Sequence, residues 1–374
     1  MSDGVSLDRK SWVTRVLVAF GLMAVLGCAS GVLQYEEVEK LEINEEYDKM
    51  IKVKEIAPAA ASADGLKPGP EEAKPPEKKK KSKVVKKVPK TKKEKEPVKV
   101  DKEQQKKPEE KVEEKPVIEV KKKQPELEDG EGFDGRRPEN DPFGVGERIV
   151  LSVKYFAMSA GELTLESRSV VEVNGRLSYH FAIGVKTHSF FSRVYEVDDW
   201  AETYMDYQDM VPYNLAVHVK ESKQLKESRS VYDFNTGKAN YWEKKVTKDK
   251  GEKNRKVSWD ILPFSQNVIS AIFYLRTFTL RTGKKIAFRV ADAGKNIIFR
   301  AEVLREERLE TDKAEMNTHV LRLEFEQDGV FKKTGDVFVW LTKDKRKFPV
   351  RVESKIKIGT LVGTLKELVP GRQP

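Results

Sequence analysis

The acidic segment Asp198-Asp199-Trp200-Ala201-Glu202 combines residue types that could carry out chemistry. If the segment is a strand, Asp198, Trp200 and Glu202 share one face, because side chains alternate along a strand. Two carboxylates can serve as acid and base on a glycoside, and an aromatic ring can stack on a sugar. An exposed strand edge whose charges discourage aggregation would show the same residues. Asp198, Trp200 and Glu202 are therefore candidate ligand-binding residues, and a catalytic role is the less favoured alternative.

The tryptophans of the C-terminal part suggest a second kind of contact. Large aromatic side chains in a curved sheet usually pack in the core. Any that lie on a concave face would form an apolar groove for a lipid or a sugar. We include Trp259 among the candidate binding residues for this reason.

Common catalytic and metal-binding motifs are absent from the sequence. The four histidines stand at no metal-ligand interval, and the single cysteine cannot form a Cys/His cluster. The sequence contains no Gly-x-Ser-x-Gly elbow, phosphate-binding loop or dinucleotide fingerprint. We therefore expect no metal, no cofactor and no enzymatic activity.

The one cysteine, Cys28, closes an apolar run that spans residues 16–26 and follows several basic residues. This order is typical of a secretory signal, and the run is too short to span a bilayer. The tetrapeptide Val25-Leu26-Gly27-Cys28 resembles a bacterial lipobox, although Leu26 stands where a smaller residue is usual. The resemblance implies cleavage before Cys28 and attachment of a lipid to its thiol. A buried apolar cysteine, in an ordinary signal or in an unprocessed helix, is the alternative.

Composition divides the chain of 374 residues into four parts. Residues 1–28 form the predicted lipoprotein signal, and residues 29–66 are acidic and expected to be mostly disordered. Residues 67–143 are rich in Lys, Glu and Pro, and their low hydrophobicity predicts a disordered tether. The basic residues of the tether up to position 124 are all lysine, which favours a solvated spacer over specific anion recognition. Residues 144–374 carry steady apolar alternation and form the predicted domain.

The pattern of the C-terminal part predicts a mainly β fold. Short alternating strands follow one another from Glu147, and Asn174-Gly175 is a strong hairpin signal. Residues 264–275 show helical spacing and predict one short helix at an open end of the sheet. Residues 244–256 are highly charged and predict a loop. The expected architecture is a large curved antiparallel sheet, either an open barrel or a sandwich.

Several segments resemble the family called domain of unknown function 3108. They are residues 146–155 with Ala160-Gly161, residues 190–199, residues 270–276, and residues 339–344 with 348–350 and 358–359. The resemblance implies an exported bacterial protein, often a lipoprotein, with a strongly curved antiparallel sheet. It implies no reaction and no catalytic residues.

These observations predict an outer-membrane lipoprotein, because Ala29 rather than aspartate follows Cys28. The membrane would be bound through the N-terminal lipid, with the domain in the periplasm or at the cell surface. The domain would bind an envelope lipid, glycan or anionic wall polymer at the end of the tether. A structural or assembly factor acting on an envelope protein is the alternative, and a hydrolase of envelope polymer is less favoured. The net charge of +10 permits anionic partners, but export argues against nucleic acid.

Overall fold

The computed structural model describes residues 45–56, 130–156, 158–193, 195–311, 314–327, 330–331, 337–356 and 359–373. The chain divides into two units, residues 1–57 with 121–374 and residues 58–120, and every described residue belongs to the first. The predicted signal, Cys28 and the lysine-rich segment 67–124 lie outside the described residues.

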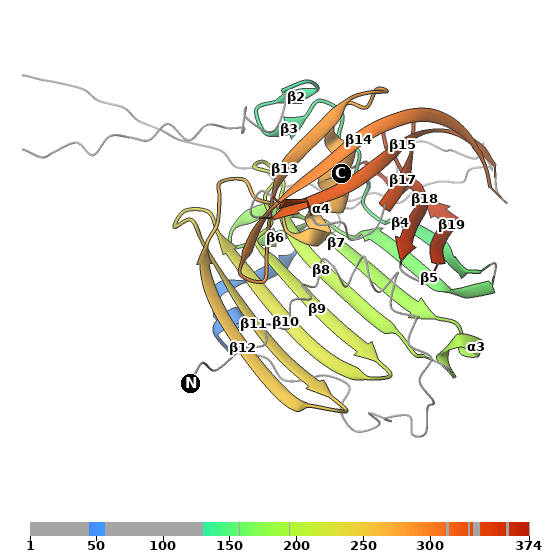
Figure 1. The fold of residues 1–374 in the computed structure, drawn as a ribbon. Coiled ribbons are helices and arrows are strands. Elements are labelled where there is room, and N and C mark those ends of the chain that lie inside the picture. The colour runs from blue at the N-terminus through green and yellow to red at the C-terminus, as the bar shows by residue number, and fades with distance from the viewer. Residues whose placement is uncertain are drawn as a thin grey trace, which may run out of the picture. The chain divides into compact units, whose positions relative to one another are not determined.

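A large antiparallel sheet that does not close on itself dominates the fold (Figure 1). The predicted fold class is thereby confirmed. The sheet strands before the helix α4 are β1 (Val53–Glu55), β4 (Glu147–Tyr155), β5 (Met158–Ser167), β6 (Val171–Val173), β7 (Arg176–Thr187), β8 (Asp198–Asp206), β9 (Asn214–Glu221), β10 (Gln224–Asp233), β11 (Lys238–Thr247) and β12 (Gly251–Asp260). Those after it are β13 (Lys285–Asp292), β14 (Lys295–Glu310), β15 (Glu315–Gln327), β16 (Val330–Phe331), β17 (Val337–Thr342), β18 (Pro349–Ile356) and β19 (Gly359–Val369).

Most neighbours in the sheet are also neighbours in the sequence. The pairing runs from β7 through β8, β9, β10 and β11 to β12, and from β13 through β14, β15, β17 and β18 to β19. β19 then pairs with β4, which joins the last strand of the domain to the first long one. Between β12 and β13 the chain leaves the sheet to form α4 (Val268–Tyr274) and the 3-10 helix η1 (Leu275–Thr277).

The antiparallel order gives the curved sheet two distinct ends. The connections β4–β5, β7–β8, β9–β10, β11–β12 and β18–β19 all lie at one end, which we call the open rim. The chain enters α4 from the opposite end, which we call the helix end. The short helix α3 (Ser189–Ser192) belongs to the open rim.

The core lies between α4 and the inner face of the sheet. Six of the seven residues of α4 are buried, so the helix is surrounded by side chains on most sides. The ring of Phe273 stacks on Phe181 of β7 at 4.0 Å, and Phe143 meets Phe181 edge to face at 4.9 Å. The predicted helix over 264–275 is confirmed in position but begins later, because Asn267 caps its first turn.

A segment that we call the N-terminal strap, residues 45–56, lies on the outer face of the sheet. It contains α2 (Glu45–Met50) and β1, which pairs antiparallel with β6. Ile51 is buried in a cluster with Val173, Val231 and Trp242. The strap therefore joins the β domain, although composition placed it in the acidic segment 29–66.

The fold also extends on the N-terminal side of position 144. The hairpin of β2 (Phe133–Asp134) and β3 (Arg137–Pro138) packs at the helix end, where the ring of Phe133 meets Phe278 edge to face at 5.3 Å. Phe143 has no exposed surface.

The prediction of a charged loop over 244–256 is wrong. These residues form the end of β11 and the start of β12, joined by a short turn. Several of the charged side chains pair across strands or contact neighbouring elements, so a high charge does not oppose the ladder here. The Asn174-Gly175 hairpin is confirmed, with φ values of 51° and 83°.

Candidate functional site

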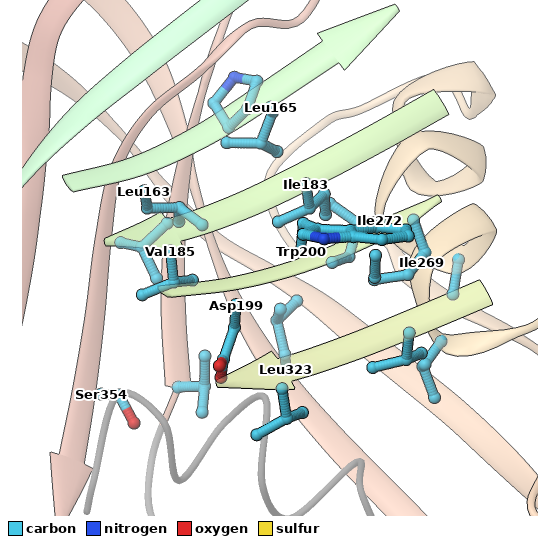
Figure 2. A pocket seen from close by; sticks show the side chains of 18 of the residues that line it. Leu163, Leu165, Ile183, Val185, Asp199, Trp200, Ile269, Ile272, Leu323 and Ser354 are labelled. Carbon is cyan, nitrogen blue, oxygen red and sulfur yellow. The ribbon is translucent and has the colours of Figure 1, made fainter. Parts of the chain in front are cut away.

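An apolar cavity of about 160 Å³ lies between the inner face of the sheet and α4 (Figure 2). Its apolar lining comes from strands on both sides of the curved sheet and from the helix: Leu163, Leu165, Ile183, Val185, Ala201, Val217, Val219, Val268, Ile269, Ala271, Ile272, Phe299, Leu323, Phe325, Val337, Val339, Pro349 and Val352. Val185, Ile272 and Leu323 are only half-buried, so part of each side chain faces the cavity and not packed neighbours.

Hydrogen bonds at the start of α4 fix the helix against the sheet. The Asn267 side chain accepts from the backbone of Ser270 at 2.8 Å and donates to Thr203 of β8 at 2.8 Å. Gln266, the preceding residue, donates to the Met210 carbonyl at 2.7 Å. Because helix capping and sheet attachment use the same asparagine, the cavity wall formed by α4 has a defined position.

The other end of the helical segment is held by a buried ion pair. Arg276 of η1 donates to Glu147 of β4 at 2.6 and 3.0 Å, and both side chains are 1% exposed. Arg346 also donates to Glu147 at 2.8 Å. The paired geometry and the extra donor compensate for the desolvation of the buried charges.

The cavity has a polar side toward the open rim, lined by Asp199, Glu221, Gln224, Lys226 and Ser354. Glu221 accepts from Gln224 at 2.6 Å. Burial, and next the nearby Glu221 carboxylate, raise the pKa of Asp199 well above its usual range. The cavity thus offers an apolar interior and a small polar group beside the strand ends.

A further buried group lies at the same end of the sheet. The ammonium group of Lys226 is 3.3 Å from the Glu243 carboxylate. The buried Asp292 is the last residue of β13. Burial raises the pKa of Asp292 to about 6. Within the described part of the chain, the Asp292 Oδ2 atom has no hydrogen-bond partner.

The size and lining of the cavity restrict what it can hold. A dry cavity of about 150 Å³ lined by Leu, Ile and Phe accommodates a molecule of the size of benzene. A slender apolar group fits such a space, whereas a sugar ring would lose its hydrogen bonds to water without replacement. The arrangement therefore suits a hydrocarbon segment whose polar end stays near Asp199 and Lys226.

The predicted group Asp198, Trp200 and Glu202 shares one face of β8, as the alternation indicated, but it is the outer face. Asp199 and Ala201 face the cavity, whereas the ring of Trp200 stacks on His218 of β9 at 5.5 Å. Asp198 pairs with Lys186 at 2.8 Å. Trp200 belongs to a strand that lines the cavity, but its ring lies on the outer side of the sheet.

The second carboxylate of the group, Glu202, has basic partners as well. His180 lies 3.1 Å from it and Arg168 lies 3.4 Å from it. The hydrogen bond with His180 lowers the pKa of Glu202. Charges that are already paired in this way are suited to holding strands together.

The fourth predicted residue, Trp259, is not brought together with the other three. It lies on β12, four strands from β8, and the register places it on the inner face. Its ring meets Tyr232 edge to face at 6.4 Å. Its Nε1 atom is buried and has no hydrogen-bond partner within the described residues. Cys28, the predicted lipidation site, lies outside the described residues.

Sequence reasoning did not identify the cavity or its polar side. The alternation of Leu163 with Leu165, and of Ile183 with Val185, could have indicated inward-facing residues. Their meeting with Leu323 on β15 depends on the strand order, for which the sequence carries no local signal.

Within the described ranges, no group of three or more His, Cys, Asp and Glu side chains is placed to hold a metal ion. None of the helices there has the length and apolar composition needed to cross a bilayer.

Comparison with known proteins identifies a family and distant solved structures. Residues 151–366 match the family described as "Protein of unknown function (DUF3108)". A search of curated proteins found no match. The chain is similar to the crystal structure of a beta-barrel-like protein of domain of unknown function DUF1849 from Brucella abortus, with a TM-score of 0.41 and 11% identity. That similarity covers 61% of this chain and 98% of the other.

Proposed function

The chain belongs to the DUF3108 family of proteins of unknown function, and from that premise we propose that it is a lipid-binding lipoprotein of the cell envelope. Its β domain binds an envelope lipid by taking a hydrocarbon segment into the cavity between α4 and the sheet. It acts as a binding protein and not as an enzyme.

The apolar cavity with one polar side carries this proposal. Ligand sites are commonly concave and apolar, with a few polar groups that orient the ligand. Here Leu323 and Ile272 supply apolar walls, and Asp199 and Lys226 stand at the polar side. An amphiphile presents the same two kinds of surface. A glycan, which is the other ligand expected from the sequence, would suit this lining less well.

The placement in the envelope rests on the N-terminal sequence. The lipobox resemblance at Cys28 supports attachment of the chain to a membrane, and Ala29 supports the outer membrane. An exported lipoprotein would encounter phospholipids and lipid-linked intermediates in the envelope, which are ligands of the class that the cavity fits.

Binding of a fatty acid tests the proposal directly. The full chain with Cys28→Ser would be titrated with a polyene fatty acid whose fluorescence rises in apolar surroundings. We expect saturable binding, and Leu323→Trp should weaken it at least about tenfold, because the larger ring occupies the cavity. Leu262→Trp is the matched control, since Leu262 is 43% exposed and lies outside the cavity lining.

The outcome depends on the contrast between the two tryptophan variants. A wild-type chain that binds neither fatty acids, lysophospholipids nor phospholipids would overturn the proposal. Equal weakening by Leu323→Trp and Leu262→Trp would place binding outside the cavity and would also overturn it. Native mass spectrometry of the chain purified from cells supplies an independent measurement, in which a lipid adduct should be lost in Leu323→Trp.

A further inference from the structure

Three large apolar side chains protrude at one place on the open rim. Phe156 in the β4–β5 connection is 67% exposed, Met158 at the start of β5 is 51% exposed, and Phe190 in α3 is 69% exposed. We call these three side chains the aromatic rim. Isolated exposed apolar residues are common, but a group at the end of a cavity indicates a contact surface.

The β4–β5 connection and the β7–β8 connection, which contains α3, meet because β5 pairs with both β4 and β7. Gly161 stands opposite Thr187 in the β5–β7 ladder. The backbone of His188, just before α3, donates to the Ala160 carbonyl at 3.0 Å. Figure 1 shows α3 beside the end of β5. The aromatic rim is thus one local surface built from two connections.

Phe156 combines a strained backbone with an exposed ring. Its φ is 47°, in the left-handed region that bulky residues rarely adopt. The ring packs against Tyr155 at 4.5 Å and remains exposed. Strain of this kind persists where the surrounding structure holds it, and it concentrates at functional positions.

Basic side chains accompany the exposed rings. Lys154 and Arg193 are exposed, and neither forms an ion pair with another described residue. Aromatic or aliphatic residues next to lysine and arginine are the combination that binds bilayer interfaces, particularly anionic ones. A stable protein interface, by contrast, normally buries about 800 Å² on each partner. Three side chains on protruding connections offer much less than that.

The aromatic rim also lies at the end of the strands that line the cavity. Leu163 of β5 and Val185 of β7 both face the cavity, and each rim residue lies within a few positions of one of them along the chain. α4 closes the opposite end. A hydrocarbon chain leaving a bilayer at the rim would meet the polar side of the cavity first and the apolar interior next.

We propose that the aromatic rim binds the surface of an anionic lipid bilayer and brings the cavity to its lipid source. The role of the rim in bringing lipid to the cavity rests on the proposed lipid-binding function. The bilayer contact itself depends on the rim residues and not on the cavity.

Vesicle binding and fatty-acid binding test the two proposals separately. The full chain with Cys28→Ser would be floated with vesicles of phosphatidylcholine, with or without phosphatidylglycerol. The rim variant carries Phe156→Asn, which tolerates the positive φ, and Phe190→Ser. The control carries Leu177→Ser and Leu262→Ser, which remove side chains that are 44% and 43% exposed at the helix end. We expect the rim variant to bind anionic vesicles at least about tenfold more weakly, and the control to bind like wild type.

Each result bears on one proposal. Loss of vesicle binding in the rim variant, with fatty-acid binding in solution unchanged, supports the aromatic rim as the bilayer contact. A rim variant that binds anionic vesicles like wild type overturns the rim proposal and leaves the cavity proposal intact. Wild type that binds no vesicles but crosslinks to an envelope protein through the rim also overturns it. Wild type whose cavity binds neither fatty acids, lysophospholipids nor phospholipids overturns the cavity proposal alone, because flotation is scored independently.

Discussion

Arg276 and Glu147 form a two-point ion pair that joins η1 to β4 at the closed end of the cavity. Their side chains are 1% exposed, so removing one partner leaves a buried charge without compensation. This pair and the Asn267 cap hold the two ends of the helical segment that forms a wall of the cavity.

Glu147→Gln should lower the free energy of unfolding by about 3–5 kcal/mol, because the Arg276 guanidinium would keep its buried position without a carboxylate. Urea unfolding monitored by circular dichroism measures the change. Lys238→Gln is the control, since its partner Asp260 is 86% exposed and the pair is 2.9 Å long. An exposed pair contributes at most about 1 kcal/mol. Equal losses in the two variants would contradict the role assigned to the buried pair.

Asn174→Gly should loosen the attachment of the N-terminal strap while preserving the β6–β7 turn. Glycine adopts the positive φ of this turn, but it lacks the side chain that bonds the Lys52 amide and the Met50 carbonyl, each at 3.0 Å. Each lost hydrogen bond is worth about 1 kcal/mol. Hydrogen exchange of the Lys52 amide should therefore accelerate about tenfold or more. Asn235→Gly, in the β10–β11 turn, should leave this exchange unchanged.

Asp292 should make the protein less stable as pH rises from about 4 to about 6. Burial raises its pKa in the folded state to about 6 from an ordinary value of 3.8. The folded state therefore keeps a proton that the unfolded state loses, and its stabilising effect is complete below the ordinary pKa. The effect is lost as pH passes the folded pKa, and the shift corresponds to up to about 3 kcal/mol.

The measurement is the pH dependence of the urea midpoint in wild type and Asp292→Asn. The asparagine removes the titrating group, so its stability should change less with pH and should exceed that of wild type above about pH 6. Asp260→Asn, at a side chain that is 86% exposed, serves as the control. An unchanged pH dependence in Asp292→Asn would assign the effect to another group.

Local patterns in the sequence predicted the strands, the Asn174-Gly175 turn and the helix near residue 270, because periodicity and turn chemistry are local. The alternation along the strand also predicted that Asp199 lies on the other face of the sheet from Asp198 and Trp200. Local patterns did not predict which face is inner, since that depends on where α4 packs. The docking of the strap was also missed, because its partner strand β6 lies more than a hundred residues away. An acidic composition gives no sign of such pairing.

The strap changes what the lysine-rich segment can do. Ile56 at the end of the strap and Gly130 at the start of the next described range belong to one unit. Residues 57–129 therefore begin and end on the same domain while the strap is docked. In a chain that is lipidated at Cys28, only residues 29–44 then separate the lipid from the domain. That stretch spans at most roughly 55 Å when fully extended, whereas a tether that included residues 67–143 would reach much farther.

Deleting residues 67–124 should therefore leave the distance between the domain and the membrane unchanged. Lengthening the chain between residues 29 and 44 should increase it. Energy transfer from a fluorophore on Asp260→Cys to labelled lipid head groups, in vesicles carrying the lipidated full chain, measures this distance. Asn174→Gly supplies the decisive comparison, because the loosened strap undocks more often, and in each undocked chain the whole segment up to residue 129 is part of the connection. In that background the deletion should bring the domain closer to the membrane. A deletion that shortens the distance equally in both backgrounds would show that the strap does not set the reach.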